Sequence, residues 1–126
     1  MVRAIRAAAG KTPIRGVHVA LVSDAEMAEL HDRFMGDPST TDVLTFDLRE
    51  HRDAAELEGE IAVCVDAARR QARQWRVSVR EELLRYAIHG VLHLLGYDDD
   101  VPARRRRMRR AEDRILKMLR TRSVHE

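Results

Sequence analysis

The strongest constraint on the fold is an apolar stripe along residues 84–95, which has the spacing of an α-helix. Its members recur every three or four positions, so they face one side of a helix that must pack on a core. The stripe consists of Leu84, Ala87, Ile88, Val91, Leu92 and Leu95. His89 and His93 lie together on its flank, and side chains at i and i+4 share a helix face. This pattern predicts two imidazoles at the edge of a core, where they would line a cleft.

The segment after this helix can supply a third ligand of a metal site. Gly96 can end the helix, and the chain that follows can bring Asp98 or Asp99 back toward the imidazoles. Two imidazoles and one carboxylate suit Zn²⁺, and three protein ligands leave a fourth position for water, whose pKa zinc lowers from about 15.7 to about 7. The histidine pair alone is a weak signal, because a chain with 6 histidines produces such spacings by chance. Its place beside the core stripe favours a metal site.

Gly90 bears on the kind of reaction. In zinc peptidases the helix reads His-Glu-x-x-His, and the glutamate is the general base. Here Gly90 occupies that position and cannot accept a proton. Peptide hydrolysis by this route therefore lacks its base, so a zinc peptidase is the less favoured interpretation.

Residues 89–98 carry a resemblance to a known family. They read His-Gly-Val-Leu-His-Leu-Leu-Gly-Tyr-Asp, and with residue 99 they match ten of the eleven positions in His-Gly-x-Leu-His-Leu-x-Gly-Tyr-Asp-His. This is the signature of the YbeY family, metal-dependent endoribonucleases of ribosomal RNA maturation. Residues 41–46, Thr-Asp-Val-Leu-Thr-Phe, resemble the family's Thr-Asp-Val-Leu-Ser-Phe, and residues 59–61, Gly-Glu-Ile, resemble its Gly-Asp-Ile. Further matches in the last helix are Met108, Glu112 and Ile115. The resemblance extends from about Val17 to Leu119.

The resemblance implies a zinc-dependent, single-strand-specific endoribonuclease that acts in ribosomal RNA processing and ribosome maturation. It implies one Zn²⁺ per chain, held by His89, His93 and Asp99, where Asp99 stands in place of the family's third histidine. Water on the metal would be the reacting group, and no general base is assigned. Asp98 or Asp100 could compete with Asp99, but Asp99 occupies the family's ligand position. The implied partners are ribosomal RNA and the ribosomal subunit or its proteins, with neither DNA nor a membrane; the oligomeric state is left open.

Three more positions depart from the family. His31 stands in place of an asparagine, Met35 in place of an arginine, and Asp47 in place of a proline. The change at Met35 matters most, because a guanidinium there would hold a phosphodiester and its developing charge. Arg33 is close in sequence but points to a different helix face. These changes leave a second interpretation open: a ribosome-associated metal-binding protein with weak or no nuclease activity, whose metal chiefly stabilises the fold.

Positive charge is concentrated near the C-terminal end of the chain. Of the 23 basic residues, 21 are arginine, and nine of these arginines lie within residues 104–122. Arg104, Arg105 and Arg107 are candidate RNA phosphate contacts, whose contribution would weaken with salt. A charge run is more often a solvated helix face, and the net charge is only +2. No aromatic residue interleaves these arginines, which argues against a platform for stacking bases.

The length of 126 residues predicts one domain over residues 1–126. The order of elements predicts an α+β fold, in which about five helices pack around a three- or four-stranded mixed sheet. The predicted strands are 16–22, 43–48 and 60–65, and the predicted helices are 2–9, 24–34, 67–75, 78–95 and 102–122. Ser23 or Asp24, Asp66 and Ser78 are the expected N-caps, and Pro102 suits the first turn of the last helix. The charged connection 49–53 is expected to be a mobile loop, and His51 in it an unlikely ligand.

Cys64 is the single cysteine of the chain and lies in the apolar run 61–65. It cannot form an internal disulfide, so the expectation is a small buried hydrophobe without a chemical role. No apolar run approaches the ~20 residues needed to cross a bilayer, and residues 1–30 lack the apolar region of a signal peptide. A cytoplasmic location is the expectation.

Overall fold

The computed structural model describes residues 1–51 and 53–125, except for the side chains of residues 122–125. In this part of the chain it contains five helices and three strands, which confirms the predicted α+β fold. Arg52 of the charged connection and the side chain of Arg122 in the arginine segment lie outside the described part.

The three strands form one mixed sheet in the order β1-β3-β2. β1 (Ile14–Val22) pairs in parallel with β3 (Leu57–Cys64), and β2 (Val43–Asp47) pairs with β3 in the antiparallel direction. Ile61 of β3 lies opposite Val19 on one side and opposite Thr45 on the other. As the central strand, β3 carries the most buried side chains of the sheet, which explains why its sequence is almost continuously apolar from residue 61 to residue 64.

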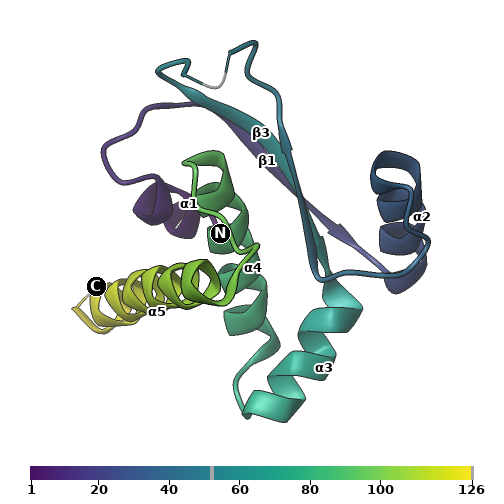
Figure 1. The fold of residues 1–126 in the computed structure, drawn as a ribbon. Coiled ribbons are helices and arrows are strands. Elements are labelled where there is room, and N and C mark those ends of the chain that lie inside the picture. The colour runs from purple at the N-terminus through teal and green to yellow at the C-terminus, as the bar shows by residue number, and fades with distance from the viewer. Residues whose placement is uncertain (52, 126) are drawn as a thin grey trace.

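The helices lie on both sides of the sheet, with α4, α1 and α5 on one side and α2 on the other (Figure 1). Their bounds are α1 (Val2–Ala9), α2 (Asp24–Met35), α3 (Val65–Trp75), α4 (Val79–Leu94) and α5 (Pro102–His125). α4 contacts β2, β3 and the helices α1, α3 and α5, so it is the central helix of the fold. Its predicted apolar stripe supplies the fully buried side chains Ile88 and Val91. None of the described helices is long and apolar enough to cross a membrane.

Glycines at two positions let α4 and β3 approach each other closely. A Cβ atom on Gly90 would lie 2.7 Å from the side chain of Ile61. A Cβ atom on Gly59 would lie 2.8 Å from the backbone oxygen of Phe46 and 2.9 Å from the side chain of Leu94. Such distances are too short for any larger residue without movement of the core. Gly90 therefore has a packing role, in addition to leaving the helix without a glutamate at this position.

Two serine caps fix where α2 and α4 begin. The Ser23 hydroxyl accepts a hydrogen bond from the Glu26 amide, and the Glu26 carboxylate accepts one from the Ser23 amide, so Ser23 rather than Asp24 is the cap. The Ser78 hydroxyl accepts a hydrogen bond from the Glu81 amide at 3.0 Å. Both bonds satisfy amides that have no partner within the helix. The predicted caps of these two helices are confirmed.

The prediction for Asp66 is wrong. α3 begins at Val65, directly after β3 and before Asp66, and no side chain caps it. The Asp66 carboxylate instead accepts a hydrogen bond from the Asp24 amide at 2.9 Å, in the first turn of α2. The strand runs into the helix without a loop, so Asp66 is already a helical residue. Its carboxylate can then serve the neighbouring helix.

Candidate metal centre

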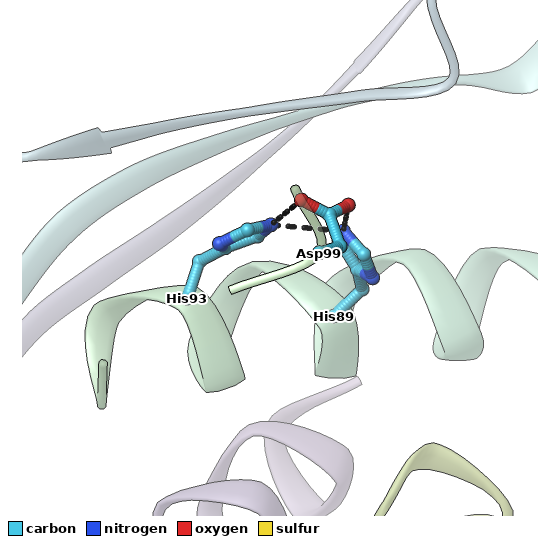
Figure 2. A group of neighbouring side chains, drawn as sticks. All are labelled: His89, His93 and Asp99. Atoms are coloured by element: carbon cyan, nitrogen blue, oxygen red, sulfur yellow. Dashed lines mark hydrogen bonds and ion pairs between the residues drawn. The ribbon is translucent and has the colours of Figure 1, made fainter. Parts of the chain in front are cut away.

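His89, His93 and Asp99 converge on one point, and we call these three residues the candidate triad. The imidazoles project from successive turns of α4, and the carboxylate comes from the segment between α4 and α5 (Figure 2). The two Nε2 atoms are 3.1 Å apart. Oδ2 of Asp99 is 3.4 Å from Nε2 of His89, and Oδ1 is 3.5 Å from Nε2 of His93. The structure thus brings together all three predicted ligands.

The separations between these donor atoms fit one small cation. Ligands at about 2.0–2.2 Å from a tetrahedral ion lie about 3.3–3.6 Å from one another, and the donor atoms of the candidate triad lie 3.1–3.5 Å apart. Two imidazole nitrogens that face each other also require a proton or a cation between them, because two lone pairs repel. The donor set is therefore chemically suited to a divalent metal ion.

Gly96 ends α4 and turns the chain toward the two imidazoles. Its φ of +104° lies in a region that residues with a Cβ rarely adopt. Its amide donates to the carbonyl of His93 at 3.0 Å, and the amide of Tyr97 donates to the carbonyl of Leu92 at 3.0 Å. These bonds satisfy carbonyls at the end of the helix, as the sequence predicts for a glycine in this position.

Of the three consecutive aspartates, the structure brings Asp99 to the imidazoles. Asp98 and Asp100 are both exposed. Asp100 forms an ion pair with Arg104 at 2.8 Å, one turn along the start of α5. In the described part of the chain, the group of metal-ligating side chains at this place includes neither Asp98 nor Asp100. The choice of Asp99 among the alternatives thus agrees with the geometry.

Glu112 of α5 holds the ring of His89 from behind. Its Oε2 lies 2.7 Å from Nδ1 of His89, and only 4% of the residue is exposed. The ring donates its Nδ1 proton to this carboxylate, so Nε2 is left as an acceptor that faces His93. A histidine that ligates a metal typically donates its other ring proton to a carboxylate in this way. Burial lowers the pKa of His89, whereas the bond to Glu112 and the charges of Glu112 and Asp99 raise it, and the net direction is upward.

Arg85 keeps the carboxylate of Glu112 in place. Its guanidinium donates to Oε1 of Glu112 at 3.0 Å and to Oδ1 of Asp113 at 2.8 Å. A buried carboxylate is stable as an anion only when it is paired and hydrogen-bonded. Arg85, Glu112 and His89 therefore form a chain of charge-assisted contacts that ends at the candidate triad.

The roles of Glu112 and Arg85 did not emerge from the sequence. They lie 27 residues apart on different helices, and no local spacing connects them. One signal was available: Glu112 shares the helical phase of the apolar positions Met108, Ala111 and Ile115. A glutamate on the buried face of a helix indicates a paired internal carboxylate.

The three predicted RNA contacts have different surroundings. Arg104 forms an ion pair with Asp100, and the aspartate partly neutralises the charge of the arginine. The guanidinium of Arg107 lies 5.5 Å from the centre of the Tyr97 ring. Arg105 lines a cavity of about 230 Å³ beside the candidate triad. Of these three arginines, Arg105 is the one found in the lining of this cavity, next to the proposed ligands.

Aromatic rings from other elements lie beside the arginines of α5. Trp75 at the end of α3 is 5.9 Å from the guanidinium of Arg109, and Tyr97 lies near Arg107. Along the sequence no aromatic residue interleaves these arginines, but in the fold two rings from other elements lie beside them. Packing of α3 and of the segment after α4 near α5 supplies the rings that the linear pattern lacks.

A second cavity, of about 650 Å³, opens on the other side of the candidate triad. Met35 and Arg49 both line it. The guanidinium of Arg49 is held by the carboxylate of Asp47 at 2.6 Å and by the carbonyl of Leu94 at 2.8 Å. Its charge is therefore fixed at the C-terminal end of α4. Asp47 stands where the family has proline. The ion pair that holds Arg49 in place is therefore a feature in which this chain differs from the family pattern.

Two other positions near the end of α2 are engaged in local contacts. Arg33 forms an ion pair with Glu29 at 2.9 Å and is not among the residues that line the second cavity. Nδ1 of His31 lies 2.7 Å from the carbonyl of Ser39. Arg33 therefore does not replace the arginine that the family carries at position 35, as its helix face predicted.

A second cluster of ligating atoms consists of Asp24, Cys64 and Asp66. The guanidinium of Arg70 already donates to both oxygens of Asp24, at 2.7 and 2.9 Å. Cys64 is buried, as predicted; its thiol donates to Asp24 at 3.2 Å, and burial raises its pKa. Because Arg70 already pairs with Asp24, this cluster is an ion pair within the protein, and we do not assign it a metal-binding or catalytic role.

Comparison with known proteins agrees with the motifs. A sequence model of the family described as Endoribonuclease YbeY matches residues 2–120. A protein named Endoribonuclease YbeY from Anaeromyxobacter sp. (strain Fw109-5) is 42% identical over 101 residues, which are 80% of this chain and 53% of the relative. Another of that name, from Frankia alni, is 39% identical over 114 residues, which cover 82% of this chain and 63% of the relative.

The fold also has a solved counterpart. The solution structure of TM1509 from Thermotoga maritima matches with a TM-score of 0.57 and 32% sequence identity, over 98% of this chain and 81% of that one. The chain spans between 53% and 63% of the length of the two relatives named above. The family model matches residues 2–120, which is nearly the whole of this chain and includes His89, His93 and Asp99. On this evidence the chain belongs to the YbeY family.

Proposed function

We propose that this protein is a zinc-dependent, single-strand-specific endoribonuclease that acts in ribosomal RNA processing and ribosome maturation. The observation that carries the proposal is the convergence of three donor atoms at 3.1–3.5 Å, with Glu112 bonded to the back of one ring. Family membership supports the reaction class, since relatives in this family are named Endoribonuclease YbeY. A ribosomal RNA substrate, with the ribosomal subunit or its proteins as partners, implies that the protein works in the cytoplasm.

The residues of the candidate triad would hold one Zn²⁺. When bound, zinc supplies Lewis acid chemistry, polarising a phosphodiester oxygen and lowering the pKa of water to about 7. Glu112 fixes the tautomer and direction of His89, so that Nε2 is the atom presented to the ion. Asp99 adds a negative charge that a third histidine would not, which weakens the Lewis acid relative to a three-imidazole site.

The arginines on either side of the candidate triad would hold the RNA backbone. Arg105 and Arg109 line the smaller cavity, and Arg49 lines the larger one. Contacts of this kind position a nucleic acid through its phosphates without reading its sequence. A bound RNA strand would thus run from one cavity to the other across the metal centre, and its scissile phosphodiester would lie between the two cavities.

A test compares cleavage of a single-stranded and a double-stranded ribosomal RNA fragment by His93→Ala and by His51→Ala. His51 is an exposed histidine in the segment between β2 and β3 and serves as the matched control. We expect the zinc-loaded wild-type protein and the control to cut the single strand and leave the duplex intact. His93→Ala should lose at least 100-fold in rate and bind zinc more weakly. Equal cleavage by the two variants would contradict the proposal.

A second candidate function is that of a metal-binding ribosome-associated protein with weak or no nuclease activity. It is favoured by Met35, which lines the larger cavity where the family has an arginine, and by the anionic ligand Asp99. In that case the metal would mainly stabilise the fold. Single-turnover experiments with zinc-loaded protein separate the two functions, because a binder protects the RNA that an endoribonuclease cuts.

Peptide hydrolysis is a third and less favoured function. Gly90 leaves the histidine helix without a proton acceptor, and its contact with Ile61 leaves no room for a glutamate. Digestion of a peptide library by the zinc-loaded protein is expected to give no products.

A further inference from the structure

The smaller cavity is a pocket where α3, α4 and α5 meet. It has a volume of about 230 Å³ and is open to solvent on one side. Trp75 of α3, Tyr86 of α4 and Arg109 of α5 line it, together with His89 and Asp99 of the candidate triad. A group bound in this pocket would therefore lie directly beside the metal centre.

Tyr86 gives the pocket a buried polar group. The residue is 5% exposed, and within the described residues its hydroxyl has no hydrogen-bond partner. Buried hydroxyls nearly always have a partner, so the hydroxyl of a residue that lines a cavity is available to a water or to a bound ligand. Burial, followed by the charges of Asp42 and Glu82, raises the pKa of Tyr86, so the hydroxyl keeps its proton and can donate it.

Glu82 adds an acceptor to the same pocket. The residue is 5% exposed, and its carboxylate oxygen lies 4.0 Å from Nε of Arg85, which is too long for a hydrogen bond. Arg85, Arg105 and Arg109 line the same pocket, so it is not acidic throughout. The charges of Asp42 and Glu82 act on the hydroxyl of Tyr86, which disfavours a phosphate group at this point. A neutral ring that carries N–H donors and ring acceptors suits it.

Trp75 gives the pocket an aromatic wall. It is 57% exposed, and its indole N–H donates to Gln71 at 2.9 Å, so the ring offers a ligand its π face. Arg109 lies 5.9 Å from the centre of this ring, and Arg105 lines the same pocket. Aromatic rings beside arginines are the common means of binding single-stranded RNA, through stacked bases and neighbouring phosphates.

We infer that this pocket binds one nucleobase of a single-stranded RNA, next to the phosphodiester at the candidate triad. The base stacks on Trp75, and its polar edge bonds to the hydroxyl of Tyr86 and the carboxylate of Glu82. Arg105 and Arg109 contact the flanking phosphates. The inference rests on the proposed function and deepens it, because it explains a preference for single strands: a base in a duplex cannot reach a buried hydroxyl.

Intrinsic fluorescence tests the inference, because Trp75 is the single tryptophan of the chain. Zinc-loaded protein is titrated separately with AMP, CMP, GMP and UMP, and with ribose 5-phosphate as the control that lacks a base. We expect at least one nucleotide to quench the fluorescence of Trp75 and ribose 5-phosphate to leave it unchanged. Quenching by none of the nucleotides, or equal quenching by ribose 5-phosphate, would overturn the inference.

A pair of matched variants tests the hydroxyl of Tyr86. Tyr86→Phe removes this one atom and keeps the buried ring, so the variant should fold, and its thermal unfolding is measured to verify this. We expect it to weaken nucleotide binding roughly fivefold, the loss of one hydrogen bond. Tyr97→Phe makes the same change at the other tyrosine, outside the pocket, and should stay within about twofold of wild type. Equal affinities of the two variants would remove Tyr86 from the inference.

Cleavage of RNA, measured on the same samples, separates this inference from the proposed function. RNA cleavage without quenching by any nucleotide leaves the endoribonuclease in place and overturns the base pocket. Quenching that depends on Tyr86, without cleavage of any RNA, leaves the base pocket in place and overturns the endoribonuclease.

Discussion

At the scale of single residues, the candidate metal centre depends on a group that bonds to the ring nitrogen of His89 that faces away from the proposed ion. Glu112 connects His89 to Arg85, so the direction of one imidazole depends on a charge pair between α4 and α5. The buried carboxylate is compensated by two donors, which makes it a rigid support. A change at Glu112 should therefore appear in metal affinity.

Glu112→Gln is expected to lower the affinity for zinc by about 10- to 100-fold, because the amide cannot orient His89 as the anion does. The affinity is measured by competition with a chromogenic chelator. Asp113→Asn is the matched control, since Asp113 also bonds to Arg85 but does not touch His89. Equal zinc affinities of the two variants would show that Glu112 does not support the metal centre.

Met35→Arg is expected to raise kcat/KM for RNA about tenfold, or about 1.4 kcal/mol of transition-state stabilisation. Met35 is 62% exposed and lines the larger cavity beside the candidate triad, so a guanidinium at this position could reach a bound phosphate. Steady-state cleavage of a fluorescent RNA provides the measurement. A new arginine that leaves the rate unchanged would show that the loss at position 35 does not limit activity.

The sequence predicted those site residues whose relation is local. His89 and His93 are one turn apart, and an aspartate can return to them after the glycine that ends the same helix, so spacing predicts two imidazoles with Asp98 or Asp99. The resemblance to the family selected Asp99. Glu112, Tyr86 and the wall at Trp75 come together only when three helices pack. No pattern within one segment carries that information.

At the scale of elements, α4 and β3 pack closely against each other. Gly90 lies against Ile61, and Gly59 lies against Leu94, so the helix and the strand are in close van der Waals contact at two positions. The orientation of α4 on the sheet sets where its two histidines lie. Packing of this element thus determines the geometry of the site.

Gly90→Ala is expected to lower the free energy of unfolding by about 1–2 kcal/mol. Overpacking of a core costs about 1–3 kcal/mol, and a Cβ atom 2.7–2.8 Å from three atoms of Ile61 places this site in the upper part of that range, about 2–3 kcal/mol. The gain in helix propensity of about 1 kcal/mol offsets part of this cost. Urea denaturation provides the measurement. Gly16→Ala, where a Cβ atom meets nothing within 4 Å, is the control and should change the stability by less than about 0.5 kcal/mol. A Gly90→Ala variant as stable as the wild type would mean that the contact is not tight.

The start of α2 carries a contact that depends on pH. The hydrogen bond from Arg70 is the main cause that lowers the pKa of Asp24 from 3.8 to about 2. The folded value is the lower one, so the ionised carboxylate stabilises the fold fully above about pH 4, and this contribution is lost as the pH falls toward 2. The urea midpoints of wild type and Asp24→Asn should differ above pH 4 and converge below it. A difference that stays constant over this range would contradict the assignment.

Helical periodicity does not by itself select the buried residues near the end of α5. Met108, Ala111 and Ile115 are buried, but of the two apolar residues that follow, Leu116 is buried and Met118 is 44% exposed. Both residues fit an apolar pattern. The choice between them depends on the angle at which α5 crosses α1 and α4, and tertiary packing sets that angle.

At the scale of the whole molecule, the fold places two cavities next to each other along α4, one beside residues 82–89 and the other beside residues 89–94. α4 contacts the sheet, α3 and α5, so its histidine edge is common to both cavities. The net charge is only +2, but arginines line each cavity. Attraction of an RNA strand would thus depend on where the charge lies more than on its total.

The fold class was predictable from the order of the elements, whereas the order of the strands was not. Alternation of helical and strand patterns predicted a small mixed sheet with about five helices. The central position of β3 follows from its pairing with both β1 and β2, and only its continuous apolar character hinted at it. Likewise, the sequence did not predict that α3 would lie beside the arginines of α5.

We propose that His89, His93 and Asp99 jointly hold one divalent ion, and anomalous scattering at the zinc edge from crystals grown with zinc tests this. We expect a single strong peak about 2.0–2.2 Å from Nε2 of both histidines and from a carboxylate oxygen of Asp99. That peak should be absent from crystals of His93→Ala grown in the same way. Crystals of the wild type that show no peak at this position, or a variant that keeps it, would contradict the claim.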